Sequence, residues 1–158
     1  MTPLTLMTDG DRTLIVTRTF DAGPERVYLA HITPALLQKW CLGPEGWTMP
    51  VCPCDPRPGG AIRYEWRKGA MGFHLTGHFL ALEPHCRIVH IERMHLPDPT
   101  PDNLVETTFA DTGSGGTLMV MRMTLPDAET RDAMLATGMA SGMEASYQRL
   151  EGMPGMVV

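Results

Sequence analysis

Hydrophobic residues near the C-terminal end of the chain recur at the spacing of a helix. They follow one another at steps of four, four, four and three: Leu135, Met139, Met143, Tyr147 and Leu150. This spacing places them on one stripe of a helical surface and predicts a single long helix over residues 127–151. Asp127 can cap its N-terminus, and Gly152 with Pro154 can end it. A stripe of this length needs a surface to pack against.

Two glycines, Gly138 and Gly142, lie inside this predicted helix. Each costs about 1 kcal/mol relative to alanine in a helix interior, so tertiary packing has to outweigh them. We expect them to permit close approach to a sheet or to leave room for a ligand beside the helix.

Upstream of this segment the hydrophobic period changes to two, which is typical of strands. The pattern predicts seven strands, over residues 13–20, 47–51, 62–67, 72–83, 87–95, 104–110 and 117–125. Residues 1–11 look like a loose start, and residues 52–58, with three prolines, read as an edge or a loop. Two short helices are expected after the first strand, one from Pro24 to Ile32 and one from Thr33 to Trp40, where Thr33 caps and Pro34 begins the helix.

An antiparallel meander of this kind buries one face only if another element covers it. The segment 127–151 is the only predicted helix long enough to do so. We therefore predict an α+β fold in which a curved antiparallel sheet wraps around the C-terminal helix, within one domain spanning residues 1–158.

Charge and composition exclude several classes of function. Asp and Glu outnumber Lys and Arg by 18 to 13, for a net charge of −5, which argues against a nucleic-acid partner. No window approaches the roughly 18 apolar residues of a membrane span, and no signal peptide is recognisable, so a cytoplasmic location is expected. The four cysteines are expected to be free thiols, because Cys52-Pro-Cys54 lacks the spacing of redox and zinc motifs.

Four stretches of the chain resemble a known family. They are Arg18-Thr-Phe-Asp-Ala-Gly-Pro-Glu-Arg-Val-Tyr, Thr33-Pro-Ala-Leu-Leu-Gln-Lys-Trp-Cys-Leu-Gly-Pro, Asp55-Pro-Arg-Pro-Gly-Gly and Gly77-His-Phe-Leu-Ala-Leu-Glu-Pro. They are similar to the START-like (SRPBCC) superfamily, and in particular to bacterial proteins like the C-terminal domain of the heat-shock-protein ATPase activator. The resemblance covers about residues 13–152 and implies a helix-grip fold with a cavity between sheet and helix.

The chain departs from the family pattern at one position. Many relatives carry two adjacent tryptophans before the Gly-Pro, whereas this chain has Trp40-Cys41. We therefore expect a roomier or less aromatic pocket at that edge. Members of the superfamily bind lipids, hormones or polyketides, some are cyclases or hydrolases, and the chaperone-activator branch acts by protein contact, so the fold alone does not select a function.

Several polar residues are candidates for chemistry, and each also has a purely structural interpretation. His74 and His78 share one strand face and His90 lies on the neighbouring strand, so together they could bind a metal or act as acid and base, although solvated histidines are the stronger interpretation. Asp55 and Arg57 are expected to form a loop-fixing ion pair. The sequence offers no nucleophile elbow and no phosphate-binding loop, and we predict no cofactor and no metal.

The remaining candidates are mostly apolar and either fill the core or line a cavity. They are Trp40, Trp47, Tyr64, Trp66, His78, Met119, Met121, Met123, Met139, Met143 and Tyr147. The resemblance favours the cavity, in which Tyr147, His78 and Arg122 are expected to supply the polar groups.

The leading hypothesis is that the protein binds a small, mostly hydrophobic molecule without catalysis. A second hypothesis is a protein-interaction or co-chaperone-like module, or a homodimer, that uses the open sheet face or the loop from Pro97 to Pro101. A third is a cyclase or hydrolase of hydrophobic substrates that uses His78 or Tyr147.

Overall fold

The computed structural model describes residues 3–153 and has the α+β helix-grip fold expected from the sequence. Its strands are β1 (Thr5–Asp9), β2 (Thr13–Phe20), β3 (Thr48–Val51), β4 (Ala61–Lys68), β5 (Met71–Glu83), β6 (Arg87–His95), β7 (Asn103–Asp111) and β8 (Thr117–Thr124). They form one antiparallel sheet of eight strands in the order β1-β2-β8-β7-β6-β5-β4-β3. The sheet is therefore a meander in which β8 inserts between β2 and β7.

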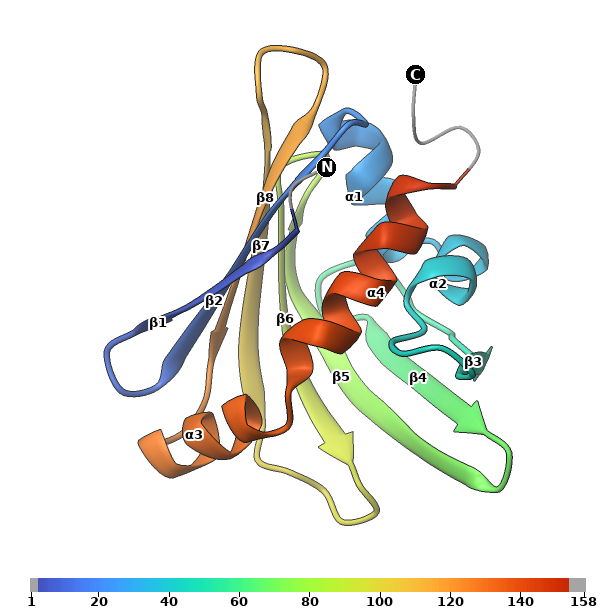
Figure 1. Cartoon of the computed structure of the whole chain (residues 1–158), viewed down its shortest axis with the longest axis vertical. Helices are drawn as coiled ribbons and strands as arrows, with labels where there is room; N and C mark the ends of the chain where they lie inside the picture. Colours follow the sequence, from blue (N-terminus) through green and yellow to red (C-terminus); the bar gives the residue numbers. More distant parts are fainter. Residues whose placement is uncertain (1–2, 154–158) are drawn as a thin grey trace.

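Four helices accompany the sheet: α1 (Pro24–Ile32), α2 (Pro34–Trp40), α3 (Ala128–Ala136) and α4 (Met139–Glu151). Helix α4 runs diagonally across the concave face of the curved sheet, with α1 and α2 beside its C-terminal half and α3 near its start (Figure 1). The apolar stripe of the C-terminal segment thus packs on the sheet, as its spacing predicts. None of the helices within residues 3–153 is both long and apolar enough to cross a membrane.

The predicted single helix over residues 127–151 is wrong in one respect, because it is divided into α3 and α4. Gly138 adopts φ 71° and ψ 31°, in the left-handed region, and α4 begins at the next residue. A residue without a Cβ adopts this conformation at little cost, which is why the chain turns there. The predicted ends are confirmed: Asp127 accepts a hydrogen bond from the Thr130 backbone N–H at 2.7 Å, and Gly152 is the C-cap. Pro154 lies outside the described residues.

The N-terminal segment and Thr33 also differ from prediction. Residues Thr5–Asp9, expected to be loose, form the edge strand β1, which pairs with β2 through a hairpin that contains Gly10 at φ 62°. A five-residue strand that is mostly exposed leaves little alternation to detect. Thr33 does not cap α2 with its side chain, since its hydroxyl donates instead to the Leu29 carbonyl of α1 at 2.6 Å. Pro24 and Pro34 begin their helices as predicted.

The sheet places alternate residues on its concave inner face. On β8 the methionines at 119, 121 and 123 are buried, whereas Leu118 is exposed and the residues at 120 and 122 are partly exposed. Buried residues of the inner face include Leu14, Val16, Arg18, Phe20, Ile62, Trp66, Leu75, Phe79, Ile88, Val105, Thr107, Phe109, Met119, Met121 and Met123. Gly77 lies on this face between Leu75 and Phe79, and a Cβ there would stand 2.0 Å from the Ile91 carbonyl oxygen, so β5 and β6 can approach only with glycine at that position.

Candidate functional site

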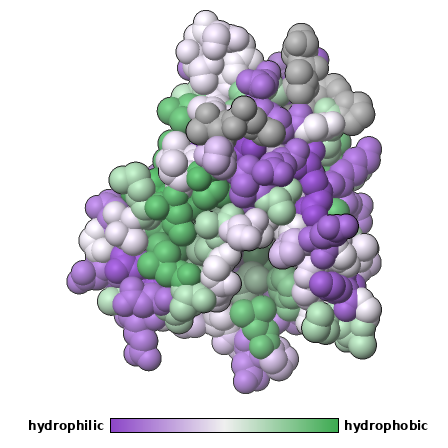
Figure 2. Space-filling view, viewed as in Figure 1, coloured by the Kyte–Doolittle hydropathy of each residue, from purple (hydrophilic) through white to green (hydrophobic). Residues whose placement is uncertain are grey.

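Three adjoining hollows lie between the sheet, α3 and α4. We name them the Met-lined cavity, of about 300 Å³, the aromatic cleft, of about 420 Å³, and the α3 cleft, of about 720 Å³. Met94 of β6 and Met139 at the start of α4 line all three. Figure 2 shows this side of the molecule hollowed next to the start of α4, with hydrophobic residues bordering the recess. The three hollows therefore adjoin one another at the start of α4.

The Met-lined cavity has mostly apolar walls with a few polar groups. Its residues are His31, Trp40, Cys41, His90, Glu92, Met94, Val105, Thr107, Met121, Met123, Met134, Met139, Met143, Ser146 and Tyr147. Six of these are methionines, whose unbranched side chains adapt to varied shapes. Sites for small ligands usually combine such walls with a few convergent polar groups.

Trp40 and Tyr147 form the aromatic end of the Met-lined cavity. Their rings stack with centroids 5.9 Å apart, and the Trp40 indole N–H donates to the Ala30 carbonyl at 2.9 Å. His31 packs against Trp40 with ring centroids 4.8 Å apart. Burial raises the pKa of the Tyr147 hydroxyl above its ordinary value, so this group stays protonated and can donate a hydrogen bond.

The aromatic cleft lies between α4 and the loop that follows α2. Its residues are Cys41, Leu42, Gly43, Pro44, Trp47, Trp66, Phe73, Met94, Met139, Gly142, Met143 and Ser146. Helix α4 holds the loop at Gly43, whose N–H donates to the Ser146 hydroxyl at 2.8 Å and whose carbonyl accepts from the Arg149 guanidinium at 2.6 Å. The Trp66 indole N–H donates to the Cys41 carbonyl at 2.8 Å, which fixes the ring in the wall.

Gly142 faces this loop rather than the sheet. A Cβ on Gly142 would lie 3.4 Å from Cδ of Pro44, so the helix passes close to the loop at this point. Cys41, which stands where many relatives have a second tryptophan, lines both the aromatic cleft and the Met-lined cavity. The smaller side chain therefore borders both hollows at the edge where the sequence predicted a less aromatic pocket.

The polar wall of the Met-lined cavity is a histidine–glutamate pair that the sequence did not reveal. His90 Nε2 lies 2.8 Å from Glu92 Oε1, and both side chains are mostly buried. Their strand register signals this position: His90 stands opposite Phe79, and Phe79 belongs to the inner face. His31 lies nearby with its Nδ1 hydrogen-bonded to the Val27 carbonyl at 2.7 Å. Burial, with a smaller contribution from the charge of His90, lowers the His31 pKa to about 4 despite that hydrogen bond.

Eight of the eleven predicted site residues line the hollows: Trp40, Trp47, Trp66, Met121, Met123, Met139, Met143 and Tyr147. Three do not. Met119 is fully buried in the core, and Tyr64 packs edge-on against Trp66 with ring centroids 6.0 Å apart. His78 is exposed on the outer face of β5, so its expected place in the pocket is wrong.

The other polar residues considered from the sequence lie outside the hollows or on different faces of the sheet. Arg122 is on the outer side, where its guanidinium forms an ion pair with Asp9 at 2.6 Å, so it cannot supply polarity to the cavity. The three histidines do not share one face of the sheet. His90 is on the inner face, whereas His74 and His78 are on the outer face, where His74 stacks on His95 with ring centroids 4.1 Å apart. The Asp55–Arg57 ion pair is confirmed at 2.6 Å.

Comparisons with known proteins agree with this architecture. A family model described as "Activator of Hsp90 ATPase homolog 1-like protein" matches residues 21–154. The crystal structure of a protein from Rhodobacter sphaeroides is similar with a TM-score of 0.87 and 31% identity, over 94% of this chain and 95% of that chain. A protein from Chromobacterium violaceum is 30% identical with a TM-score of 0.73, over 88% and 94%.

A third structure, from Mycobacterium smegmatis, has a TM-score of 0.83 at 23% identity, over 94% of this chain and 95% of that chain, and shows the shared fold alone. Among curated proteins no match was found.

Proposed function

This chain belongs to the family of activator of Hsp90 ATPase homolog 1-like proteins, and on that premise we propose that it binds a small, mostly hydrophobic molecule under α4, without catalysis. The observation that carries the proposal is the set of three adjoining hollows that share Met94 and Met139. The side chains of the sheet, α3 and α4 leave this space unfilled, whereas protein interiors are in general packed about as densely as organic crystals. The Met-lined cavity and the aromatic cleft are each within the size range of small-molecule sites.

The composition of the walls supports an apolar ligand. The thioether and aromatic side chains gain dispersion contacts with any apolar surface, and methionine sulfur interacts favourably with aromatic rings. Burial of apolar ligand surface contributes roughly 25 cal/mol per Å², which provides the main driving force for binding.

The experiment uses the uncharged fluorescent probe N-phenyl-1-naphthylamine, whose emission rises in apolar surroundings. The wild-type protein should bind it saturably, and binding should raise the melting temperature, because a ligand present at a hundredfold excess over its Kd stabilises by about 2.7 kcal/mol. Native mass spectrometry of the purified protein tests in parallel whether a molecule is retained.

A matched pair of variants locates the binding. Met139→Trp places a bulky ring where the three hollows meet and should weaken probe binding at least tenfold. Met71→Trp adds the same ring at an exposed position of the β4–β5 hairpin and should bind the probe like the wild type. Equal affinity of the two variants for the probe would contradict the proposal.

A second candidate function is a protein-interaction or co-chaperone-like role. The family description favours it, since it names an activator of the Hsp90 ATPase. Such a role, with the cytoplasmic location that it requires, predicts that the purified chain stimulates ATP hydrolysis by an Hsp90-type chaperone. An unchanged ATPase rate at saturating concentrations of this chain would remove that candidate.

A further inference from the structure

Two side chains on the inner face of the sheet carry buried polar atoms that have no hydrogen-bond partner within residues 3–153. The atoms are Nδ1 of His90 and both Nδ2 and Oδ1 of Asn103, and Asn103 is only 1% exposed. Buried polar groups are nearly always paired, since leaving one unpaired is costly, and the exceptions tend to occur at functional sites.

The strand register brings these atoms to one place. Glu92 of β6 stands directly opposite Asn103 of β7, and His90 stands opposite Val105, two positions further along the same pair of strands. Two residues along a strand span about 7 Å. On the other side of Glu92 the opposite residue is Gly77, which contributes no side chain to the row.

The two residues also border adjoining hollows. His90 lines the Met-lined cavity and Asn103 lines the α3 cleft, and these two hollows share three methionines, Met94, Met134 and Met139. A flat molecule that lies along the strands can therefore contact both polar groups while the methionines pack against it.

The hydrogen bond to Glu92 fixes what His90 can offer a ligand. A carboxylate only accepts, so in the neutral ring Nε2, which lies 2.8 Å from Glu92 Oε1, carries the proton, and Nδ1 is an acceptor. The negative charge of the carboxylate polarises the ring and strengthens that acceptor, which favours an acidic donor such as a phenol. The Asn103 carboxamide presents N–H donors on Nδ2 and a carbonyl acceptor, Oδ1, and one hydroxyl group can form a hydrogen bond with each of these two atoms.

We propose that the ligand is a flat, largely aromatic molecule with two phenolic hydroxyl groups about 7 Å apart. One hydroxyl donates to His90 Nδ1, and the other donates to Oδ1 and accepts from Nδ2 of Asn103. The inference rests on the proposed ligand-binding function and assigns the chemical class of its ligand. Trp40 and Tyr147 at the end of the cavity and the methionines along it suit an aromatic frame.

Isothermal titration with naphthalene, 2-naphthol and 2,6-dihydroxynaphthalene tests the assignment. In a cavity that offers only apolar contacts, each added hydroxyl weakens binding, because the hydroxyl loses its hydrogen bonds to water and gains none in the cavity. Here each hydroxyl should tighten binding roughly fivefold, because it pairs a buried polar atom of the protein. The reverse order of affinities overturns the inference. If none of these compounds binds while N-phenyl-1-naphthylamine does, the inference fails alone; if that probe also fails to bind, the proposed function fails with it.

Two variants assign the individual hydrogen bonds. Asn103→Leu keeps a similar shape without polar atoms, so the melting temperature of the ligand-free protein should stay unchanged or rise, and 2,6-dihydroxynaphthalene should lose its advantage over 2-naphthol. The double variant His90→Phe with Glu92→Leu, which leaves no carboxylate without its partner, should remove the advantage of 2-naphthol over naphthalene.

Thr108→Val removes a hydroxyl from the outer face of β7 and is the matched control, which should keep the wild-type order of affinities. A melting temperature of Asn103→Leu several degrees below that of the wild type, or an unchanged preference for the hydroxylated compounds in both variants, contradicts the assignment.

Discussion

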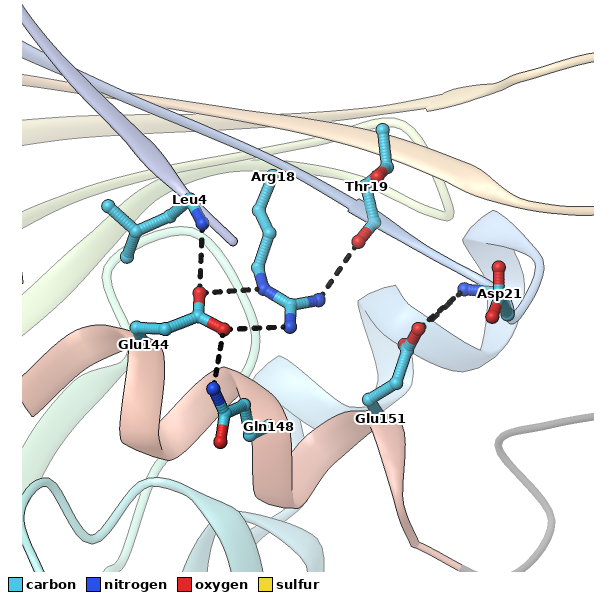
Figure 3. A network of polar contacts seen from close by, with 7 residues as sticks. All are labelled: Leu4, Arg18, Thr19, Asp21, Glu144, Gln148 and Glu151. Atoms are coloured by element: carbon cyan, nitrogen blue, oxygen red, sulfur yellow. Dashed lines mark hydrogen bonds and ion pairs between the residues drawn. The ribbon is translucent and has the colours of Figure 1, made fainter. Parts of the chain in front are cut away.

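Arg18 of β2 and Glu144 of α4 form a two-pronged ion pair between the sheet and the helix that crosses it (Figure 3). The Arg18 Nε donates to Oε1 of Glu144 at 3.0 Å, and its second terminal nitrogen donates to Oε2 at 3.1 Å. The Arg18 side chain is fully buried, while that of Glu144 is 16% exposed. Glu144 also accepts from the Leu4 backbone N–H and from Gln148, so one carboxylate connects β2, the segment before β1 and α4.

Removal of the Glu144 charge should destabilise the protein strongly. The Glu144→Gln variant leaves the buried guanidinium without an anion, and breaking a buried pair in this way typically costs about 3–5 kcal/mol. Arg18→Met removes the buried charge and leaves Glu144 with its other donors, so we expect a smaller loss. Urea denaturation of the two single variants and of the double variant measures the coupling. Strictly additive losses in the double variant would contradict a direct interaction.

The left-handed conformation of Gly138 predicts opposite responses at the two glycines of the C-terminal segment. Gly138→Ala should lower the free energy of unfolding by about 1–2 kcal/mol, because an L residue is strained at this φ, although nothing lies within 4 Å of the new Cβ. Gly138→Asn should lose less, since asparagine tolerates the left-handed region better. Urea denaturation measures both.

Gly142→Ala is the control for this prediction. It lies inside α4, where alanine is favoured over glycine by roughly 0.5–1 kcal/mol. Its new Cβ would stand 3.4 Å from Pro44, at the limit of ordinary contact, so the variant should be near wild-type stability or above it. An equal loss of stability at both positions would show that the left-handed conformation of Gly138 is not the cause of the loss in Gly138→Ala.

The sequence predicted the fold well because periodicity depends on neighbours within one element. The alternation at residues 119, 121 and 123 marked the inner face of β8, and the stripe of Met139, Met143, Tyr147 and Leu150 marked the buried side of α4. Gly138 shows the limit of that signal, because a glycine that weakens a helix and a glycine that ends one look alike in sequence.

The polar part of the site depended on information that is not local. Arg18 and Glu144 are 126 residues apart in the chain, so neither position indicates the other. The metal-binding alternative needs His90 on the same face as His78, but His78 pairs with Ile91 and His90 pairs with Phe79. A register difference of one residue moves a side chain to the opposite face of a sheet, and only the paired strands define it.

The four cysteines should differ sharply in reactivity. Cys86 is exposed, whereas burial raises the thiol pKa of Cys41 and Cys52 to about 12 and also raises that of Cys54. Because the thiolate is the reactive form, an aromatic disulfide reagent at pH 8 should modify one thiol quickly in the native protein and the other three slowly. Cys86→Ser should abolish the fast phase, and a fast phase that persists would contradict this order.

The environment of His31, which is partly buried against Trp40 and Phe109, predicts a loss of stability on mild acidification. Its pKa is about 4 in the folded protein, against about 6.5 when unfolded, so between these values the unfolded chain binds the extra proton. The free energy of unfolding is therefore highest above pH 6.5 and falls as the pH drops, by at most about 2 kcal/mol between pH 7 and pH 5. The depressed pKa of Glu144, caused mainly by its hydrogen bonds from Arg18, adds a loss only at lower pH.

The variant His31→Asn isolates this contribution. An asparagine side chain can still donate to the Val27 carbonyl but does not titrate. The free energy of unfolding of the variant should therefore fall less than that of the wild type between pH 7 and pH 5. The remaining histidines and the pair of His90 and Glu92, which lies close to His31 across the cavity, are present in both proteins, so their shared contributions cancel to first order. His78→Asn removes an exposed histidine of the outer face and should keep the wild-type pH dependence. Urea denaturation at the two pH values measures the free energy of unfolding of all three proteins. An equal fall between pH 7 and pH 5 in the wild type and in His31→Asn would show that His31 titrates alike in the folded and unfolded states.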